Sequence, residues 1–353
     1  MPSTPLVSVV VPTYNAGAYL AELCASLCAQ SLEDFEVLIL SDGGDDFLHP
    51  EVVRYRQDRR FQITSWARNR GVSAATAELL RRVRGRFWCY PGADDILERD
   101  FLAARAEVAT RNPRVNVIFG PGTQVDAQGA PTWYDALHVV EARMSIFDRQ
   151  VIGPERMLRL LLQENVINTP SVFCRSETTI PLLLSERIEW QYAQDYHYWI
   201  LLAAAVGGFH YDARPLHRYR IHGGQLSADA RRSAVRLAEI RLVPLVALRA
   251  AARRSPVGAA AWQRWGGTLY ALWLLRAVQL RRRGVFRPEW QQEADLAFHG
   301  RTLRRWEMAW RVGWRLLPAL VSRWREKQCM DRQVWVNGLR AADDPIFRRS
   351  NAN

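Results

Sequence analysis

The sequence predicts an α/β fold, with a mostly parallel sheet flanked by helices and then a mostly helical C-terminal region. Two observations predict the sheet. Apolar, β-branched runs alternate with segments of helical periodicity over the first 120 residues, and the runs are nearly continuously apolar, as in strands covered on both faces. A third observation predicts the second region, because from about residue 228 the pattern is almost entirely helical.

The elements of the first 120 residues follow from runs that end in turn or capping residues. Strands are expected in five of them, in chain order "PLVSVVVPTYN", "FEVLILSDGG", "FQIT", "RFWCY" and "VNVIFG". Helical spacing predicts helices over 16–30 and 98–111. A further helix is expected from Ser73, as its N-cap, to Gly85, which ends it.

The pattern becomes mixed after Gly129. The run "NTPSVFCR" predicts a strand, and "HRYRIHGGQLS" predicts a short strand with a glycine turn. Between them a helix is expected from about Asp195 to Gly207. In the helical region, breaks are expected at four prolines, Pro244, Pro256, Pro288 and Pro318.

Charge divides the chain at about the same point as the helical pattern does. Residues 1–227 hold 23 of the 48 Lys+Arg and 26 of the 36 Asp+Glu, a net charge of −3. Residues 228–353 hold the other 25 and 10, a net charge of +15, together with nine of the 14 tryptophans. We therefore predict two parts with different roles, 1–227 and 228–353.

Composition and cysteine usage indicate a cytoplasmic globular protein. The N-terminus has no signal-peptide pattern, and no run reaches the ~18 uncharged apolar residues of a spanning helix. The longest candidate begins at Trp265 and is interrupted by Arg276. The cysteines have no metal-ligand spacing, and we expect reduced core thiols at Cys24, Cys28, Cys89, Cys174 and Cys329.

Polar side chains follow three of the predicted strands. They are Thr13, Tyr14 and Asn15 after the first, Asp42 after the second, and Asp94 and Asp95 after "RFWCY". In an open parallel sheet the carboxyl ends of the strands lie on one edge, and ligands bind there. The sequence therefore predicts that these three clusters converge on one site.

Two adjacent carboxylates repel each other unless something neutralises them. A divalent cation does so, because Mg²⁺ and Mn²⁺ prefer oxygen ligands and commonly bridge a carboxylate to a substrate diphosphate. We therefore expect Mn²⁺ or Mg²⁺ at Asp94 and Asp95. The alternative is that one of them caps the helix that follows.

The order "VSVVVPTYNAGAYLAELCASLCAQSLEDFEVLILSDGGDD", "NRGVSAA" and "GADD" resembles the inverting family 2 glycosyltransferases with the GT-A, Rossmann-like fold. The resemblance covers residues 7–111 and continues more weakly to about 227. It implies a nucleotide-sugar site in 1–120 and an acceptor side in 121–227.

The resemblance also implies roles on the donor side. Asp42 matches the position that hydrogen-bonds the base, usually uracil, and Thr13 and Tyr14 match those that frame and stack on it. Asp94 and Asp95 keep the pair that contacts ribose and metal, with Gly92 in place of the family's first acid. The implied nucleotide-binding residues are Pro12, Thr13, Tyr14, Asp42, Arg70 and Asp94. Arg70 or Arg81 would replace the family's arginine, because Thr76 stands in its position.

On the acceptor side, "AQDYHYW" matches the family's Glu-Asp pair, with Gln194 in place of the glutamate and Asp195 as the implied catalytic base. A role as a helix N-cap is the alternative for Asp195. In "YRIHGGQLS" the resemblance implies that His222 approaches the metal and Arg220 the diphosphate. We interpret the other histidines here as structural, namely His197, His210 and His217.

The resemblance implies an inverting enzyme that moves a sugar from a UDP-sugar to a glycan or a lipid-linked acceptor. Two rivals remain. A nucleotidyltransferase also uses paired aspartates, but it normally carries a glycine-rich, basic phosphate loop, and "PTYNAGAY" has no basic residue. The other rival is a degenerate scaffold that binds a glycan or a partner protein, which Gly92, Gln194 and Thr76 favour.

The basic tail "RTLRRWEMAWRVGWRLLPALVSRWREK" spaces Trp306, Trp310 and Trp314 as one face of a helix, with arginines around it. Such a helix can lie on an anionic membrane, here the inner face of the plasma membrane. The alternative is packing onto the enzyme or onto a second copy as a homodimer. We do not expect a nucleic-acid partner.

Overall fold

A computed structural model of the chain describes residues 4–132, 144, 147–148, 150–186, 188–226 and 233–298. The N-terminal part alternates strands with helices: β1 (Val7–Thr13), α1 (Ala18–Cys28), β2 (Phe35–Asp42), η1 (Asp46–Leu48), α2 (Pro50–Val53), η2 (Arg54–Gln57), β3 (Phe61–Trp66), α3 (Val72–Arg82), β4 (Phe87–Cys89), β5 (Ile96–Leu97), α4 (Phe101–Arg111), β6 (Val117–Phe119) and β7 (Thr123–Val125). The later elements are β8 (Val151–Ile152), α6 (Pro154–Gln163), η3 (Thr169–Ser171), β9 (Phe173–Arg175), α7 (Ser176–Leu184), α8 (Gln194–Ala205), β10 (Phe209–Tyr211), β11 (His217–Arg220), α10 (Ala234–Ala252), α11 (Pro256–Arg282) and α12 (Pro288–Phe298).

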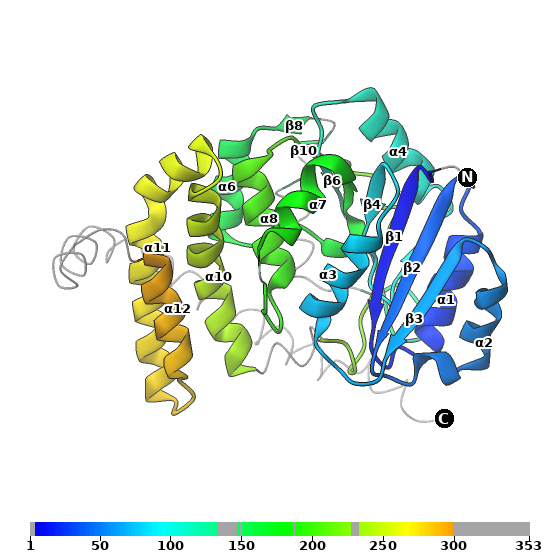
Figure 1. Cartoon of the computed structure of the whole chain (residues 1–353), viewed down its shortest axis with the longest axis horizontal. Helices are drawn as coiled ribbons and strands as arrows, with labels where there is room; N and C mark the ends of the chain where they lie inside the picture. Colours follow the sequence, from blue (N-terminus) through cyan, green and yellow to red (C-terminus); the bar gives the residue numbers. More distant parts are fainter. Residues whose placement is uncertain are drawn as a thin grey trace, which may run out of the picture. The chain divides into compact units, whose positions relative to one another are not determined.

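The strands form the predicted mixed α/β architecture (Figure 1). The large sheet has the order β3-β2-β1-β4-β9-β6-β10-β8. Its first four strands are parallel, as are β6 and β10, whereas β9 is antiparallel to both of its neighbours. A smaller sheet, β5-β11-β7, places β11 directly beside the strand that follows Asp94 and Asp95.

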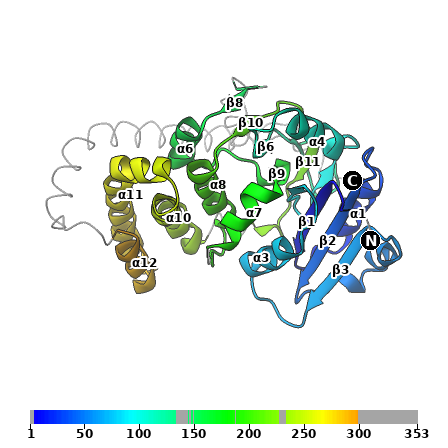
Figure 2. The same ribbon diagram turned by 45° about the horizontal axis from the view of Figure 1, so that its top comes forward.

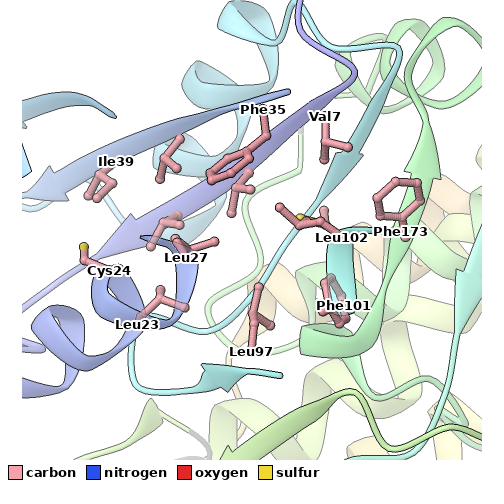
Figure 3. Close-up of a cluster of buried hydrophobic side chains, with 14 of the residues drawn as sticks. Val7, Leu23, Cys24, Leu27, Phe35, Ile39, Leu97, Phe101, Leu102 and Phe173 are labelled. Atoms are coloured by element: carbon pink, nitrogen blue, oxygen red, sulfur yellow. The ribbon is translucent and has the colours of Figure 1, made fainter. Parts of the chain in front are cut away.

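The core explains why the first strands are almost continuously apolar. Alternate residues of β1 and β2 pack with α1 on one face of the sheet, joined by side chains of α4 and β9 (Figure 3). Both faces of these strands are covered, so all eight residues of β2 are buried. Cys24, Cys89 and Cys174 are buried, as predicted, but Cys28 is exposed.

Three local predictions are wrong. Gly71, with φ 89°, is the N-cap of α3, so Ser73 lies inside the helix and its hydroxyl is free to bond elsewhere. The start of the predicted strand "NTPSVFCR" is the 3-10 turn η3. Pro244 lies inside α10, where packing against α8 and α11 outweighs the cost of a helical proline, about 3 kcal/mol. Pro256 and Pro288 instead open helices, where no N–H is needed.

The helices that follow residue 228 are not a separate compact unit. Contacts group Met1–Phe298 together and divide the chain at His299. Figures 1 and 2 show α10, α11 and α12 side by side, with α10 packed on α8. Among the described residues, no helix is both long enough and apolar enough to cross a membrane. The tryptophan-rich tail lies outside the described residues.

Candidate active site

The loops after β1 and β2 are held together by a carboxylate that the sequence motifs did not single out. Asp46 is buried and accepts hydrogen bonds from the hydroxyls of Thr13 (3.0 Å) and Ser41 (2.8 Å). It also accepts from the backbone N–H groups of Asn15 (3.2 Å) and Ala16 (2.6 Å). Thr13 and Ser41 are partners in the parallel register, so one side chain ties two strand ends into one edge, as predicted.

The predicted base-binding residue Asp42 supports the loop after β3. Its two carboxylate oxygens accept from the backbone N–H groups of Arg70 (2.7 Å) and Gly71 (2.8 Å), and the side chain is 3% exposed. The Arg70 guanidinium lies 4.3 Å from the centre of the Trp66 ring. Tyr14 is 55% exposed, so its ring is accessible for stacking.

The two adjacent aspartates lie between β4 and β5, and their side chains differ. Asp94 is partly exposed, whereas Asp95 is 1% exposed. The Oδ1 atom of Asp95 accepts from the backbone N–H of Arg220 (3.0 Å), and its Oδ2 atom is buried without a hydrogen-bond partner. Burial and the neighbouring Asp94 carboxylate raise the pKa of Asp95 well above its usual range.

Neither aspartate is a helix cap, so the alternative to a metal site does not hold. The next helix, α4, begins at Phe101 and its N-cap is Asp100. Gly92 instead explains the arrangement of the carboxylates. A Cβ atom at Gly92 would lie 2.6 Å from Asp95 Oδ2 and 2.8 Å from Asp94 Oδ1, so both oxygens border one small space that only glycine leaves open.

This donor set suits a hard divalent cation. Two carboxylate oxygens lie close together beside Gly92, and Asp95 Oδ2 has no hydrogen-bond partner. Among the described residues, no group of three or more His, Cys, Asp and Glu side chains could hold a metal. Mg²⁺ and Mn²⁺ need no such cage, because they are commonly bound by one or two carboxylates plus water and substrate phosphates.

The segment that follows β11 closes over the aspartates. His222 Nε2 lies 3.0 Å from Asp94 Oδ2, and its ring packs on Tyr19 with centroids 4.7 Å apart. The structure therefore brings His222 to the predicted pair. It gives Arg220 a different environment from the predicted diphosphate contact.

The Arg220 side chain is buried, and its guanidinium is already occupied. It donates to the backbone carbonyls of Asp94 (2.9 Å) and Ala127 (3.0 Å) and forms an ion pair with Glu22 at 2.6 Å. In this structure Arg220 joins the aspartate loop to α1 and to the turn after β7, and its contact with a diphosphate stays a prediction.

Asp195 lies in the first turn of α8, and its side chain is partly exposed. The N-cap of this helix is Ala193, so an N-cap role for Asp195 is wrong. The Oδ2 atom accepts from the Thr169 hydroxyl (2.5 Å), and Oδ1 accepts from the Tyr196 backbone N–H (2.7 Å). Burial raises the pKa of Asp195, and these two hydrogen bonds oppose the rise.

A buried polar cluster links the donor and acceptor sides. The Gln194 amide donates to the Tyr90 hydroxyl (2.8 Å) and to Thr76 Oγ1 (3.3 Å), and those two oxygens lie 3.0 Å apart. Tyr90 follows β4, and Gln194 begins α8. Two of the three positions at which this chain departs from the family pattern, Thr76 and Gln194, are therefore in direct contact.

A carboxylate from α10 organises the start of α8. Glu239 is 4% exposed, and it accepts from three consecutive backbone N–H groups, those of Gln191 (2.8 Å), Tyr192 (2.8 Å) and Ala193 (3.0 Å). Burial raises the pKa of Glu239, and these three bonds oppose the rise. No sequence motif signals this contact, because Glu239 lies beyond residue 227, in the part that the charge pattern separates from the rest.

The histidines interpreted as structural are buried. Burial lowers the pKa of His197 and of His217 to about 3, and it also lowers the pKa of His210. His197 Nδ1 accepts from the Trp190 indole N–H (3.0 Å), so its ring is held between elements of the scaffold.

Comparison with known proteins identifies a matching family and several relatives. Residues 8–171 match the model of the family described as Glycosyl transferase family 2. An uncharacterized glycosyltransferase of Haemophilus influenzae is 24% identical over 239 residues, which cover 65% of this chain and 69% of that protein. An N-acetylglucosaminyltransferase of Azorhizobium caulinodans is 31% identical over 124 residues, which cover 34% of this chain and 31% of that protein.

Solved structures share the fold at low identity. The crystal structure of S. aureus TarS 1-349 in complex with UDP-GlcNAc superposes with a TM-score of 0.57 at 19% identity, covering 82% of this chain and 79% of that chain. The chain spans less than half the length of several curated relatives that it matches, 18%, 31% and 41% in three cases.

Proposed function

Because residues 8–171 match the Glycosyl transferase family 2 model, we propose that this chain transfers a sugar from a nucleotide-sugar to a hydroxyl group of a glycan or a lipid-linked acceptor. The observation that carries the proposal is the carboxylate pair at Gly92: Asp95 Oδ2 is buried without a partner beside Asp94 Oδ1. A folded protein keeps such an unfavourable arrangement where a ligand compensates it.

The donor is a UDP-sugar. The S. aureus relative of this fold was solved with UDP-GlcNAc, which supports this nucleotide class. Tyr14 is exposed for stacking on the base, and Asp42 and Arg70 shape the neighbouring loop. Asp94 and Asp95 would hold Mn²⁺ or Mg²⁺, with His222 beside Asp94. A bound divalent cation neutralises the negative charge of the leaving diphosphate.

Asp195 is the general base. A carboxylate can accept the proton of an acceptor hydroxyl as the oxygen attacks the anomeric carbon. The new bond forms on the face opposite the diphosphate, the bond to the diphosphate breaks with its electron pair, and the anomeric configuration is inverted. The partly exposed position of Asp195 and its raised pKa are consistent with this role.

Calorimetry tests the donor site. The full chain is titrated with UDP, GDP, CDP and dTDP, each with Mn²⁺ and with EDTA. We expect metal-dependent binding of UDP, which Asp95→Ala abolishes. The control is Asp100→Asn, an exposed aspartate without a side-chain cap bond, which should bind like the wild type. If no nucleotide binds with or without metal, the scaffold rival is correct.

The base is tested separately from the donor site. Asp195→Asn should bind UDP with Mn²⁺ as the wild type does and should lose sugar transfer, measured as UDP release from UDP-GlcNAc with a hydroxyl acceptor. A variant that transfers at the wild-type rate would remove Asp195 from this role.

The C-terminal region supplies contact with an anionic membrane at the cytoplasmic face. The proposal rests on the +15 charge of residues 228–353 and on the Trp and Arg pattern of the tail. Deleting residues 299–353 should release the protein from vesicles that contain phosphatidylglycerol. If the full-length chain does not bind such vesicles but sediments as a dimer that the deletion dissociates, the tail mediates dimerisation instead.

A further inference from the structure

The Thr169 hydroxyl group is held from two sides. Its oxygen lies 2.5 Å from Asp195 Oδ2 and 3.4 Å from Trp199 Nε1. An indole N–H can only donate, so it points to the threonine oxygen as the acceptor. The hydroxyl proton is then left for the carboxylate, which can only accept when ionised. The direction of the bond is therefore fixed: Thr169 donates to Asp195.

The elements that carry these groups are rigid. Asp195 and Trp199 are four residues apart on α8, which places them on one face of the helix. Thr169 begins η3, which is held by Ser171. The Ser171 hydroxyl donates to the Asn168 carbonyl (2.6 Å) and accepts from the Gly120 backbone N–H (3.0 Å).

We propose that Thr169 is a positioning residue that fixes the orientation of the Asp195 carboxylate and stabilises its ionised form. The inference rests on the proposed function, in which Asp195 is the base. Thr169 holds one carboxylate oxygen and the Tyr196 N–H holds the other, so the plane of the carboxylate is set. Each oxygen keeps a further lone pair that can accept from an incoming hydroxyl group.

The hydrogen bond also acts on the protonation state of Asp195. A bond donated to the charged form of a carboxyl group favours that form, and here it opposes the effect of burial. The positive charge of Arg236 on α10 acts in the same direction. The other titratable groups that interact with Asp195 are three tyrosines and a glutamate, namely Tyr90, Tyr196, Tyr198 and Glu239. Loss of the hydroxyl should therefore raise the pKa of Asp195 further. Because a general base works only when deprotonated, the acidic limb of the rate profile should move to higher pH.

The first test needs no substrate. Carboxyl carbons of aspartate are labelled with ¹³C, and the Asp195 signal is assigned by its loss in Asp195→Asn. Titration by NMR should give a pKa of Asp195 about one to two units higher in Thr169→Val and Thr169→Ala than in the wild type. Thr169→Ser, which keeps the hydroxyl, should match the wild type. An unchanged pKa in a folded hydroxyl-free variant overturns the proposal.

The second test measures UDP release from UDP-GlcNAc as a function of pH. At pH values below the pKa of Asp195, Thr169→Val should have a kcat at least tenfold lower than the wild type, with an unchanged KM for the donor. The acidic limb of its rate–pH profile should lie about one to two pH units higher. A merely structural role would lower kcat equally at all pH values. If Thr169→Val matches the wild type while Asp195→Asn is inactive, only the positioning role fails. If Asp195→Asn is active, the base assignment fails.

Discussion

Replacing Asp95 by Asn should make the metal-free protein more stable. The Asp95 carboxylate is buried, its Oδ2 atom has no partner, and Asp94 Oδ1 borders the same space at Gly92. In Asp95→Asn the amide oxygen can still accept from the Arg220 backbone N–H. The amide N–H₂ replaces Oδ2 and can donate to Asp94, so a repulsive contact becomes a hydrogen bond.

The expected gain in the free energy of unfolding follows from the cost of leaving Asp95 Oδ2 buried without a partner. A buried polar atom without a partner costs about 1–3 kcal/mol, and the larger figures belong to charged groups. We therefore expect the free energy of unfolding of Asp95→Asn to exceed that of the wild type by about 1–3 kcal/mol in EDTA, at a pH high enough to ionise Asp95, whose pKa is raised. Urea unfolding, followed by circular dichroism and tryptophan fluorescence, measures this difference.

Ligand should reverse the order of stability. A ligand that binds only the folded state at 100 times its Kd stabilises by about 2.7 kcal/mol, and Mn²⁺ with UDP should do this for the wild type alone. Asp100→Asn serves as the control and should follow the wild type in both conditions. If Asp95→Asn unfolds at lower urea than the wild type in EDTA, the unpaired carboxylate is not a strained binding group and the reasoning is refuted.

Two other substitutions test the supports of the site. Gly92→Ala should abolish Mn²⁺-dependent UDP binding in calorimetry, because its Cβ atom would occupy the space between the carboxylate oxygens. Gly153→Ala, whose Cβ atom would meet nothing within 4 Å, should bind normally, and equal binding by both variants would contradict the assigned space. Glu239→Ala should lower the free energy of unfolding by about 2–4 kcal/mol, because three backbone N–H groups lose a charged acceptor. The exposed helical glutamate Glu293 provides the matched control, and its substitution by Ala should change stability by less than about 0.5 kcal/mol; similar losses in both variants would show that Glu239 holds nothing in place.

The strand-and-helix order of the first 120 residues could be predicted because apolar runs and helical spacing are visible within short segments of the sequence. A strand buried on both faces reads as an unbroken apolar run, and β2 is buried at every residue. Asp94 and Asp95 could also be singled out from the sequence, because two adjacent carboxylates repel each other unless something neutralises them. Helices α6 and α7 were missed, since they fall in a stretch where the apolar pattern is mixed.

The supports of the site could not be predicted in the same way, because each is a contact between distant segments. Glu239 meets Ala193 across 46 residues, and Thr169 meets Asp195 across 26. No spacing rule relates such positions. Asp46 is the exception, because it closes the run "SDGGDD", where a third acid so close to a strand end is itself a local signal.

The contact between Thr76 and Gln194 bears on whether this chain is a degenerate scaffold that has lost the catalytic site. Read separately in the sequence, these two departures from the family pattern favour a degenerate scaffold, as Gly92 does. In the structure they lie 118 residues apart and meet at Tyr90. The Thr76 hydroxyl donates to the Val72 carbonyl (2.7 Å), and the Gln194 N–H₂ group donates to Thr76 and Tyr90.

Decay by independent mutations would leave buried donors without acceptors, each at a cost of about 1–3 kcal/mol. Here the donors of the cluster are satisfied, and only Gln194 Oε1 has no partner. Thr76 and Gln194 therefore share one hydrogen-bonded cluster with Tyr90 and are not two separate packing defects. The satisfied cluster and the unpaired Asp95 Oδ2 atom both argue against the degenerate-scaffold reading.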